Sequence, residues 1–188
     1  MKKILLILIA FLLSNTVLAS DTSEAVANFK KSTQVKQFFD QAYGYAIFPT
    51  VGKGGFGIGG SYGEGSVFKA GKKTGTTTMA QVTIGFQLGG QAFSEIIFFE
   101  NKKSYDNFTS GNFEFSAQAS AVAINAGANA QTSTTGTSAG AATSPDKNQQ
   151  QGIYQNGMAT FTLIKGGLMY EAALGGQKFS FEKLNKKD

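Results

Sequence analysis

Glycine alternates with large side chains between residues 54 and 65, and this pattern constrains the fold more than any other part of the sequence. Positions 55, 57, 59, 63 and 65 are glycine and position 61 is serine, whereas positions 56, 58 and 62 are Phe, Ile and Tyr. Successive side chains of a strand point to opposite faces, so the segment predicts a strand with one bulky and one almost bare face. A bare face lets another backbone, a helix or an acyl chain approach closely.

Strand patterns continue through much of the chain. Further strands are predicted at residues 43–48, 66–70, 78–93, 94–99, 113–121, 158–165, 168–174 and 179–182. The first of these is expected to stop at Pro49, because proline cannot donate to a strand ladder. The run at 94–99 is continuously apolar apart from its first two residues, which is typical of a strand covered on both faces. The alternation from 113 changes side after 121, which predicts a bulge or bend near 121–123.

Two helices complete the pattern. Residues 21–42 have a helical apolar period whose two halves lie on rotated faces, which predicts a break near Ser32 and Thr33. Residues 101–109 predict a short helix capped by Asn101. Many strands with one leading and one short internal helix predict an α+β fold. Its antiparallel sheet is expected to be glycine-rich and strongly curved or barrel-like.

The chain begins with the pattern of a signal peptide. Lys2 and Lys3 precede an apolar run over residues 4–13, and Val17-Leu18-Ala19 forms a small-residue cleavage pattern. We therefore expect residues 1–19 to be removed and residues 20–188 to form one exported domain, periplasmic or secreted and peripheral to a membrane. Residues 131–152 are rich in Ser, Thr, Gly, Ala and Gln, which predicts a mobile loop within this domain.

The composition disfavours catalysis and nucleic-acid binding. The chain contains no Cys, His, Trp or Arg, so thiol and imidazole chemistry and zinc–thiolate sites are excluded. Removing Lys2 and Lys3 leaves 15 lysines against 12 acids, a net charge of about +3. This charge is well below that of a nucleic-acid-binding surface. We therefore expect no catalytic residue, metal or cofactor.

Two patterns in the sequence could suggest a functional site. Gly55-x-Gly57-x-Gly59 does not predict nucleotide binding, because no helix follows the glycines to face a phosphate. Glu95 and Glu100 could be a carboxylate pair for glycoside hydrolysis. They flank an apolar strand on opposite faces, however, and are interpreted as solvated charges at its ends.

The leading helix allows two interpretations. Its aromatic residues could cover one end of the sheet, as helices of globular domains usually do, and the residues alone favour this interpretation. Alternatively, its aromatics and lysines could contact an anionic bilayer. The residues concerned are Phe29, Lys30, Lys31, Lys36, Phe38 and Phe39.

Three stretches together resemble the SYLF family of lipid-binding domains. They read AYGYAIFP at 42–49, KGGFGIGGSYGEG at 53–65 and GFQLGGQAFSEIIF at 85–98, and the resemblance extends over about residues 25–183. It implies a non-enzymatic module that binds phospholipid partly through an amphipathic N-terminal helix, here residues 22–42. Some eukaryotic relatives also bind actin, a partner that an exported chain would not meet.

The sequence thus predicts an envelope domain that binds anionic phospholipid through Phe29, Lys30, Lys31, Lys36, Phe38 and Phe39. A first alternative is a small outer-membrane β-barrel or a structural envelope protein, because the alternation and the glycine content permit it. A second alternative is a hydrolase of unknown substrate, and the only support for it is a set of scattered carboxylates and serines.

Overall fold

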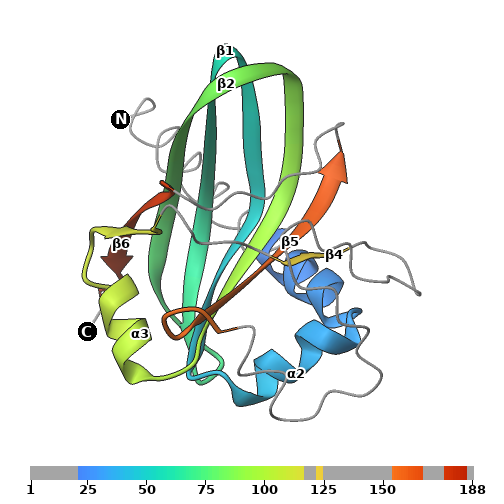
Figure 1. The fold of residues 1–188 in the computed structure, drawn as a ribbon. Helices are drawn as coiled ribbons and strands as arrows, with labels where there is room; N and C mark the ends of the chain where they lie inside the picture. Colours follow the sequence, from blue (N-terminus) through green and yellow to red (C-terminus); the bar gives the residue numbers. More distant parts are fainter. Residues whose placement is uncertain (1–20, 117–121, 125–153, 167–175, 186–188) are drawn as a thin grey trace, which may run out of the picture.

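The computed structural model describes residues 21–116, 122–124, 154–166 and 176–185 (Figure 1). In chain order the elements are a helical segment at 21–30, α2 (Thr33–Gln41), β1 (Gly44–Lys69), β2 (Lys72–Phe99), α3 (Lys102–Phe108), β3 (Phe113–Glu114), β4 (Val122–Ile124), β5 (Met158–Gly166) and β6 (Lys178–Lys183). The predicted signal peptide at 1–19, loop at 131–152 and strand at 168–174 lie outside the described residues.

The described strands form one curled sheet, which confirms the predicted α+β fold with a strongly curved antiparallel sheet, a leading helix and a short internal helix (Figure 1). The strand order is β3-β6-β2-β5-β4, and β1 pairs with β2. The pairings are antiparallel except that of β4 with β5, which is parallel. Of the strand predicted at 113–121, β3 covers Phe113–Glu114, residues 115 and 116 are not in a strand, and residues 117–121 lie outside the described residues.

β1 and β2 form one long hairpin that supplies most of the sheet. Its ladder runs from the pair Lys69–Lys72 to the pair Gly44–Phe99. Between the strands, Ala70 and Gly71 have φ angles of 48° and 74°, which is the left-handed geometry of a tight two-residue turn. The predicted strand end at Pro49 was wrong: β1 continues through it, and the ladder shifts register between Phe48 and Val51. An irregularity of this kind accommodates a residue that has no N–H to donate.

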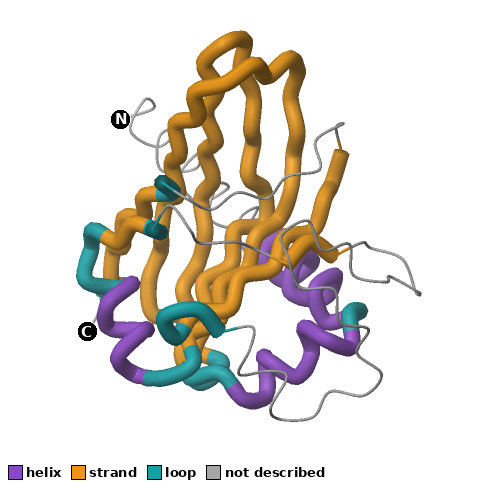
Figure 2. The backbone as a smooth tube through the Cα atoms, viewed as in Figure 1, coloured by secondary structure: helices purple, strands orange, loops and turns teal. Residues whose placement is uncertain are grey.

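The long hairpin folds back on itself and thereby curls the sheet. The ladder shifts register between Phe56, which pairs with Leu88, and Ile58, which pairs with Ile84, so β2 contributes extra residues at this point. Figure 2 shows the strands rising to this bend and returning. We call residues 58–69, residues 72–84 and β6 the first limb. Residues 44–56, residues 88–99 and β5 form the second limb.

The glycine face lies where the two halves of β1 meet. A Cβ at Gly65 would lie 2.6 Å from the Ile47 carbonyl oxygen and 2.8 Å from Cδ1 of Phe48. A Cβ at Gly63 would lie 2.8 Å from Cγ2 of Val51. Side chains from the second limb therefore lean over these glycines, and only glycine leaves them room. The group that approaches Gly63 and Gly65 is thus the other half of the same strand.

The sheet has two apolar faces. On the inner face the two limbs pack against each other: the ring of Phe48 in the second limb lies 5.7 Å from the ring of Phe179 in the first limb. Its cluster comprises Ala46, Phe48, Val51, Val67, Met79, Ile97, Phe99, Phe108, Phe115, Met158 and Phe179. The outer face carries a second cluster, which comprises Ala25, Phe29, Val35, Phe38, Ile47, Ile96, Phe98, Ala159, Phe161 and Leu163. Residues 94–99 are buried on both faces, as predicted.

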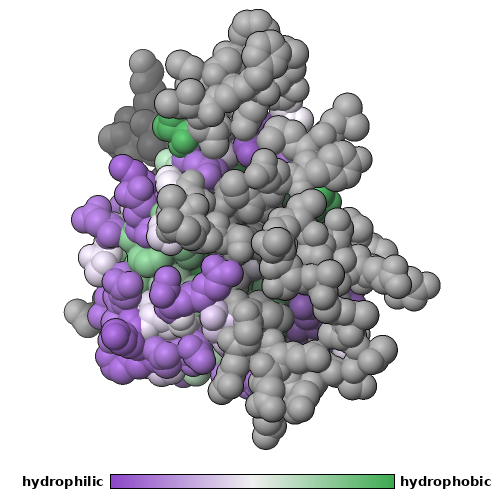
Figure 3. Space-filling model, in the orientation of Figure 1, coloured by the Kyte–Doolittle hydropathy of each residue, from purple (hydrophilic) through white to green (hydrophobic). Residues whose placement is uncertain are grey.

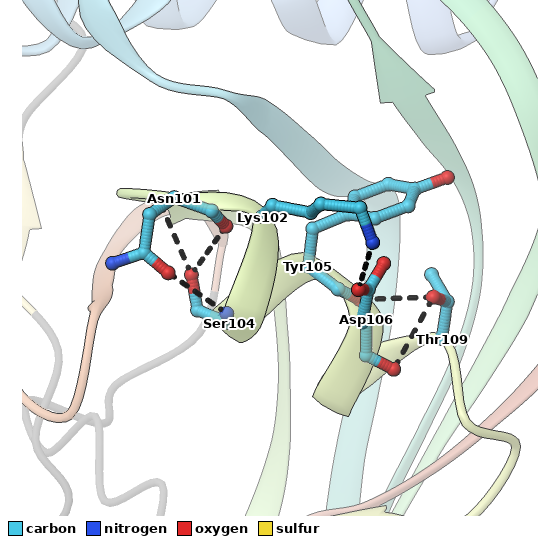
Figure 4. A network of polar contacts seen from close by, with 6 residues as sticks. All are labelled: Asn101, Lys102, Ser104, Tyr105, Asp106 and Thr109. Carbon is cyan, nitrogen blue, oxygen red and sulfur yellow. Dashed lines mark hydrogen bonds and ion pairs between the residues drawn. The ribbon is translucent and has the colours of Figure 1, made fainter.

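α3 closes one end of the inner cluster and presents a polar outer surface. Asn101 caps the helix as predicted: its side chain accepts from the Ser104 N–H at 3.1 Å, and the Ser104 hydroxyl accepts from the Asn101 N–H at 3.3 Å (Figure 4). Lys102 and Asp106 form an ion pair on the exposed side. The surface around α3 is accordingly hydrophilic (Figure 3). Phe108 points inward and is fully buried.

Candidate functional site

The leading helix is interrupted where the sequence predicted. The segment at 21–30 ends in a turn at residues 31 and 32, and α2 begins at Thr33. Ser32 has extended backbone angles, and its hydroxyl accepts from the Val35 N–H at 3.5 Å, which makes Ser32 the N-cap of α2. The interruption rotates α2 so that both helical segments turn apolar residues toward the outer face of the sheet.

Phe29 and Phe38 lie in the interior, between the helices and the sheet. Their side chains are 0% and 2% exposed. The Phe38 ring lies 5.0 Å from the Phe161 ring and 5.4 Å from the Phe98 ring, a set of tilted and edge-to-face contacts that favours close packing. These two aromatics therefore have the role that the first interpretation of the helix gave them: they cover the sheet.

Phe39 and the three lysines lie at or near the surface. Phe39 is half-buried, and its ring packs edge-on against Tyr45 at 5.3 Å and Phe98 at 5.0 Å. The Nζ atom of Lys30 lies 4.9 Å from the centre of the Phe39 ring, a cation–π contact. The structure thus brings Lys30 and Phe39 together across the joint between the two helices.

Lys30, Lys31 and Lys36 are all exposed and cluster in sequence around the helix break. Lys30 is the last residue of the first segment and Lys31 follows it, so both lie at its carboxyl end, where positive charge is favourable. The Nζ atom of Lys31 donates to the Asn28 side chain at 2.8 Å. Lys36 lies in the first turn of α2. We call Lys30, Lys31, Lys36 and Phe39 the helix-joint surface.

Acidic residues flank the helix-joint surface. Asp21 and Glu24 lie at the start of the first segment and Asp40 near the end of α2, and all three are exposed. Over residues 21–42 the three acids balance the three lysines. The positive potential is therefore confined to the joint and acts over roughly one Debye length, about 8–10 Å.

Glu95 is a second candidate site residue, separate from the helix-joint surface. Its interpretation as a solvated charge was wrong. The side chain is 0% exposed and lies in a strand that is covered on both faces. Burial raises the pKa of Glu95 to about 7, while a hydrogen bond from Gln177 acts in the opposite direction. That bond runs from Gln177 Nε2 to Glu95 Oε2 at 3.2 Å. The predicted coverage of residues 94–99 was the signal that should have placed Glu95 inside.

Glu100 does not pair with Glu95. It follows the end of β2 and is exposed, as predicted for a solvated charge, whereas Glu95 is buried. Within the part of the chain that the structure describes, no group of three or more acidic residues could hold a metal ion. The arrangement around Glu95 is therefore a lone buried carboxyl group with polar neighbours.

Two of those neighbours, Thr162 and Gln177, were not singled out from the sequence. Thr162 is the β5 residue opposite Glu95 in the ladder, and Gln177 immediately precedes β6. Both are buried, at 2% and 1% exposure. Their sequence neighbourhoods carry no motif, and only the pairing of distant strands brings them to Glu95.

None of the described helices is both long enough and apolar enough to cross a bilayer.

Comparison with known proteins gives two similarities. Residues 80–185 match the family described as "Las17-binding protein actin regulator". The chain is also 25% identical, over 158 residues, to beta cell expansion factor A of Aeromonas veronii, an alignment that covers 82% of this chain and 52% of the relative. The chain thus spans about half the length of that relative.

Proposed function

The chain belongs to the SYLF family, whose domains are non-catalytic and bind lipid, and from this premise we propose that it binds anionic phospholipid at the helix-joint surface. The proposal assigns the domain to the cell envelope, after export through the signal peptide predicted at residues 1–19. Actin, which the family description names, is not the partner we propose, because an exported chain would not meet a cytosolic filament.

The observation that carries the proposal is the exposure of three clustered lysines beside a half-buried aromatic ring. Lys30, Lys31 and Lys36 are exposed, and Phe39 presents part of its ring next to Lys30. Lysines close to an anionic leaflet each contribute about 1 kcal/mol. A ring at the same surface adds apolar contact with the interfacial region. Phe29 and Phe38 support this surface from beneath, because they anchor both helical segments to the sheet.

The presence of lysine rather than arginine at this surface determines the lipid selectivity that we expect. Its ammonium group is a compact charge without the planar fork with which arginine grips phosphate. We therefore propose recognition of negative surface charge rather than of one particular headgroup.

Vesicle co-sedimentation of the purified chain tests the proposal. We expect sedimentation with vesicles of phosphatidylglycerol and phosphatidylcholine, no sedimentation with phosphatidylcholine alone, and weaker binding as salt rises. The triple variant Lys30→Gln, Lys31→Gln, Lys36→Gln should bind about 100-fold more weakly, because it loses three contributions of about 1 kcal/mol each.

A matched control separates the helix-joint surface from net charge. The triple variant Lys72→Gln, Lys73→Gln, Lys103→Gln removes the same charge from exposed sites at the β1–β2 turn and on α3. It should retain most of the binding. Equal losses in the two triple variants would overturn the assigned surface, and equal sedimentation with and without vesicles would overturn lipid binding itself.

A further inference from the structure

The end of the β1–β2 hairpin at which the sheet bends carries no charged residue. Residues 54–63 of β1 and 74–94 of β2 contain no Asp, Glu or Lys, although charged residues make up 15% of the chain. We call residues 54–62 and 80–90, which surround the bend, the hairpin tip. It projects beyond the helices, which lie toward the other end of the strands (Figure 2). A long uncharged projection is thus the part of the sheet farthest from α2 and α3.

The hairpin tip exposes apolar side chains on the outer face of the first limb. Met79 belongs to the inner cluster, so by alternation Ala80 and Val82 point to the outer face. Val82 is 76% exposed, and Tyr62, which pairs with Ala80 in the ladder, is 54% exposed. In the described part of the chain only three large apolar side chains are exposed, and Val82 and Tyr62 are two of them. The helices do not bury this patch, because they pack on the second limb against residues such as Phe98.

Polar and charged groups begin next to Tyr62, on the side away from the bend. The Tyr62 hydroxyl donates to Oε1 of Glu64 at 3.1 Å. Asp21 and Thr50 line the same surface hollow as Tyr62 and Glu64, and Lys165 donates to the Thr50 hydroxyl at 3.0 Å. Tyr62 therefore lies at the boundary between an uncharged end and a charged body. Tyrosine favours this position at a membrane–water interface, where its ring and its hydroxyl meet different surroundings.

The spacing of these residues fits a shallow contact with lipid. Val82 lies two residues nearer the bend than Ala80, a rise of about 7 Å along the strand. Interfacial segments bury apolar groups about 5–10 Å into the boundary between headgroups and acyl chains. With the Tyr62–Ala80 pair at the membrane surface and the bend leading, Val82 reaches this depth and Glu64 stays in water. The outer edges of a hairpin carry backbone groups that need water, so the contact is with the interfacial region rather than with the hydrocarbon centre.

We propose that the hairpin tip inserts into the interfacial region of a phospholipid leaflet, with Tyr62, Ala80 and Val82 facing the lipid. The inference rests on the proposed function for the bilayer itself, but it assigns a second contact that is separate from the helix-joint surface. The lysines attract the chain to an anionic leaflet, and the tip then enters without placing a charge in apolar surroundings. Lipid fits this patch better than a charged protein partner, because the hairpin tip offers no charge to pair.

Tryptophan fluorescence tests the contact directly, because the chain contains no Trp. Val82→Trp places an indole on the exposed patch. Leu184→Trp is the matched control: Leu184 is 46% exposed, and its N–H donates to the Thr74 carbonyl oxygen at the opposite end of the first limb. With vesicles of phosphatidylglycerol and phosphatidylcholine, the emission of Val82→Trp should shift to shorter wavelength and be quenched by brominated acyl chains. Leu184→Trp should show neither effect.

A charge at the same position tests whether the contact contributes to affinity. Val82→Asp should weaken binding to these vesicles about tenfold, because a charged side chain at a lipid-facing site opposes insertion. Leu184→Asp introduces the same charge at the other end of the first limb and should bind within about twofold of wild type. Both positions are exposed, so both variants should fold.

The outcomes separate this inference from the proposed function. Sedimentation of Val82→Trp with vesicles but without a shift in emission would overturn the tip contact and leave the helix-joint surface in place. Equal vesicle binding of Val82→Asp and Leu184→Asp would also overturn the tip contact. A shift without vesicles that grows with protein concentration would assign the patch to a second copy of the chain instead.

The lysine variants complete the separation. In the Lys30→Gln, Lys31→Gln, Lys36→Gln background, an unchanged shift with unchanged vesicle affinity would support the tip contact and count against the helix-joint surface. Absence of sedimentation with every vesicle would refute both.

Discussion

The two faces of the same sheet are built differently. On the outer face, the helices cover an apolar cluster in which Phe38 contacts the rings of Phe98 and Phe161. On the inner face, β2 places the carboxyl group of Glu95 between Phe93 and Ile97, and three buried oxygen atoms lack partners there. Both faces therefore contribute buried apolar packing, and the inner face adds to it a group that can change its charge.

Phe38→Ala should have the largest effect, because it tests the outer cluster directly. Phe38 is 2% exposed, and truncation of a buried phenylalanine destabilises a protein by about 3–5 kcal/mol. Urea unfolding should show this loss. Phe39→Ala is the matched control, since Phe39 is only half-buried and should lose clearly less. Equal losses would mean that the deeper burial of the Phe38 ring adds nothing to its contribution.

Glu95→Gln should remove a pH dependence that belongs to the inner face. The folded pKa of about 7 exceeds the ordinary value of 4.5, so the folded state binds the proton more tightly than the unfolded state. Stability should then fall as pH rises from about 4.5 to about 7, by roughly 3 kcal/mol in total. Urea unfolding at pH 5 and pH 8 measures the fall in wild type, and the variant should show little of it. A wild type more stable at pH 8 than at pH 5 would contradict the assignment.

Gly65→Ala should test how closely the inner face is packed. The new Cβ would lie 2.6 Å from the Ile47 carbonyl oxygen, so the backbone must move, at a cost of about 1–3 kcal/mol. Gly52→Ala is the control, because nothing lies within 4 Å of a Cβ at that position. It should be neutral or stabilising by up to about 1 kcal/mol, through the entropy of the unfolded chain. A tolerated Gly65→Ala would show that the limbs can separate without loss.

The helix-joint lysines should matter least for stability. Replacing Lys30, Lys31 and Lys36 by Gln should change the free energy of unfolding by no more than about 0.5 kcal/mol per site, since exposed side chains seldom contribute more. Thermal unfolding provides the measurement. A larger loss would mean that these side chains support the outer cluster, and weaker vesicle binding of the variant would then need a different explanation.

Local signals in the sequence predicted the fold well, and distant pairings limited the prediction of the site. The cap at Asn101, the break at Ser32 and the bare strand face depend on neighbouring residues, and the structure has all three. The surroundings of Glu95 depend on Gln177, 82 residues away, and on a strand pairing that no local pattern specifies. The register shift at Pro49 could not be foreseen either, because it requires the partner strand to be known.

The tight turn at Ala70 and Gly71 has a consequence for how the chain folds. It lies at the closed end of a ladder that extends to the pair Gly44–Phe99, so each successive pair closes only a short loop once the preceding pair has formed. We therefore expect the hairpin to zip up from this nucleus before the more distant strands β5 and β6 dock. Because Ala70 has a φ of 48°, which asparagine adopts more readily, Ala70→Asn should speed refolding.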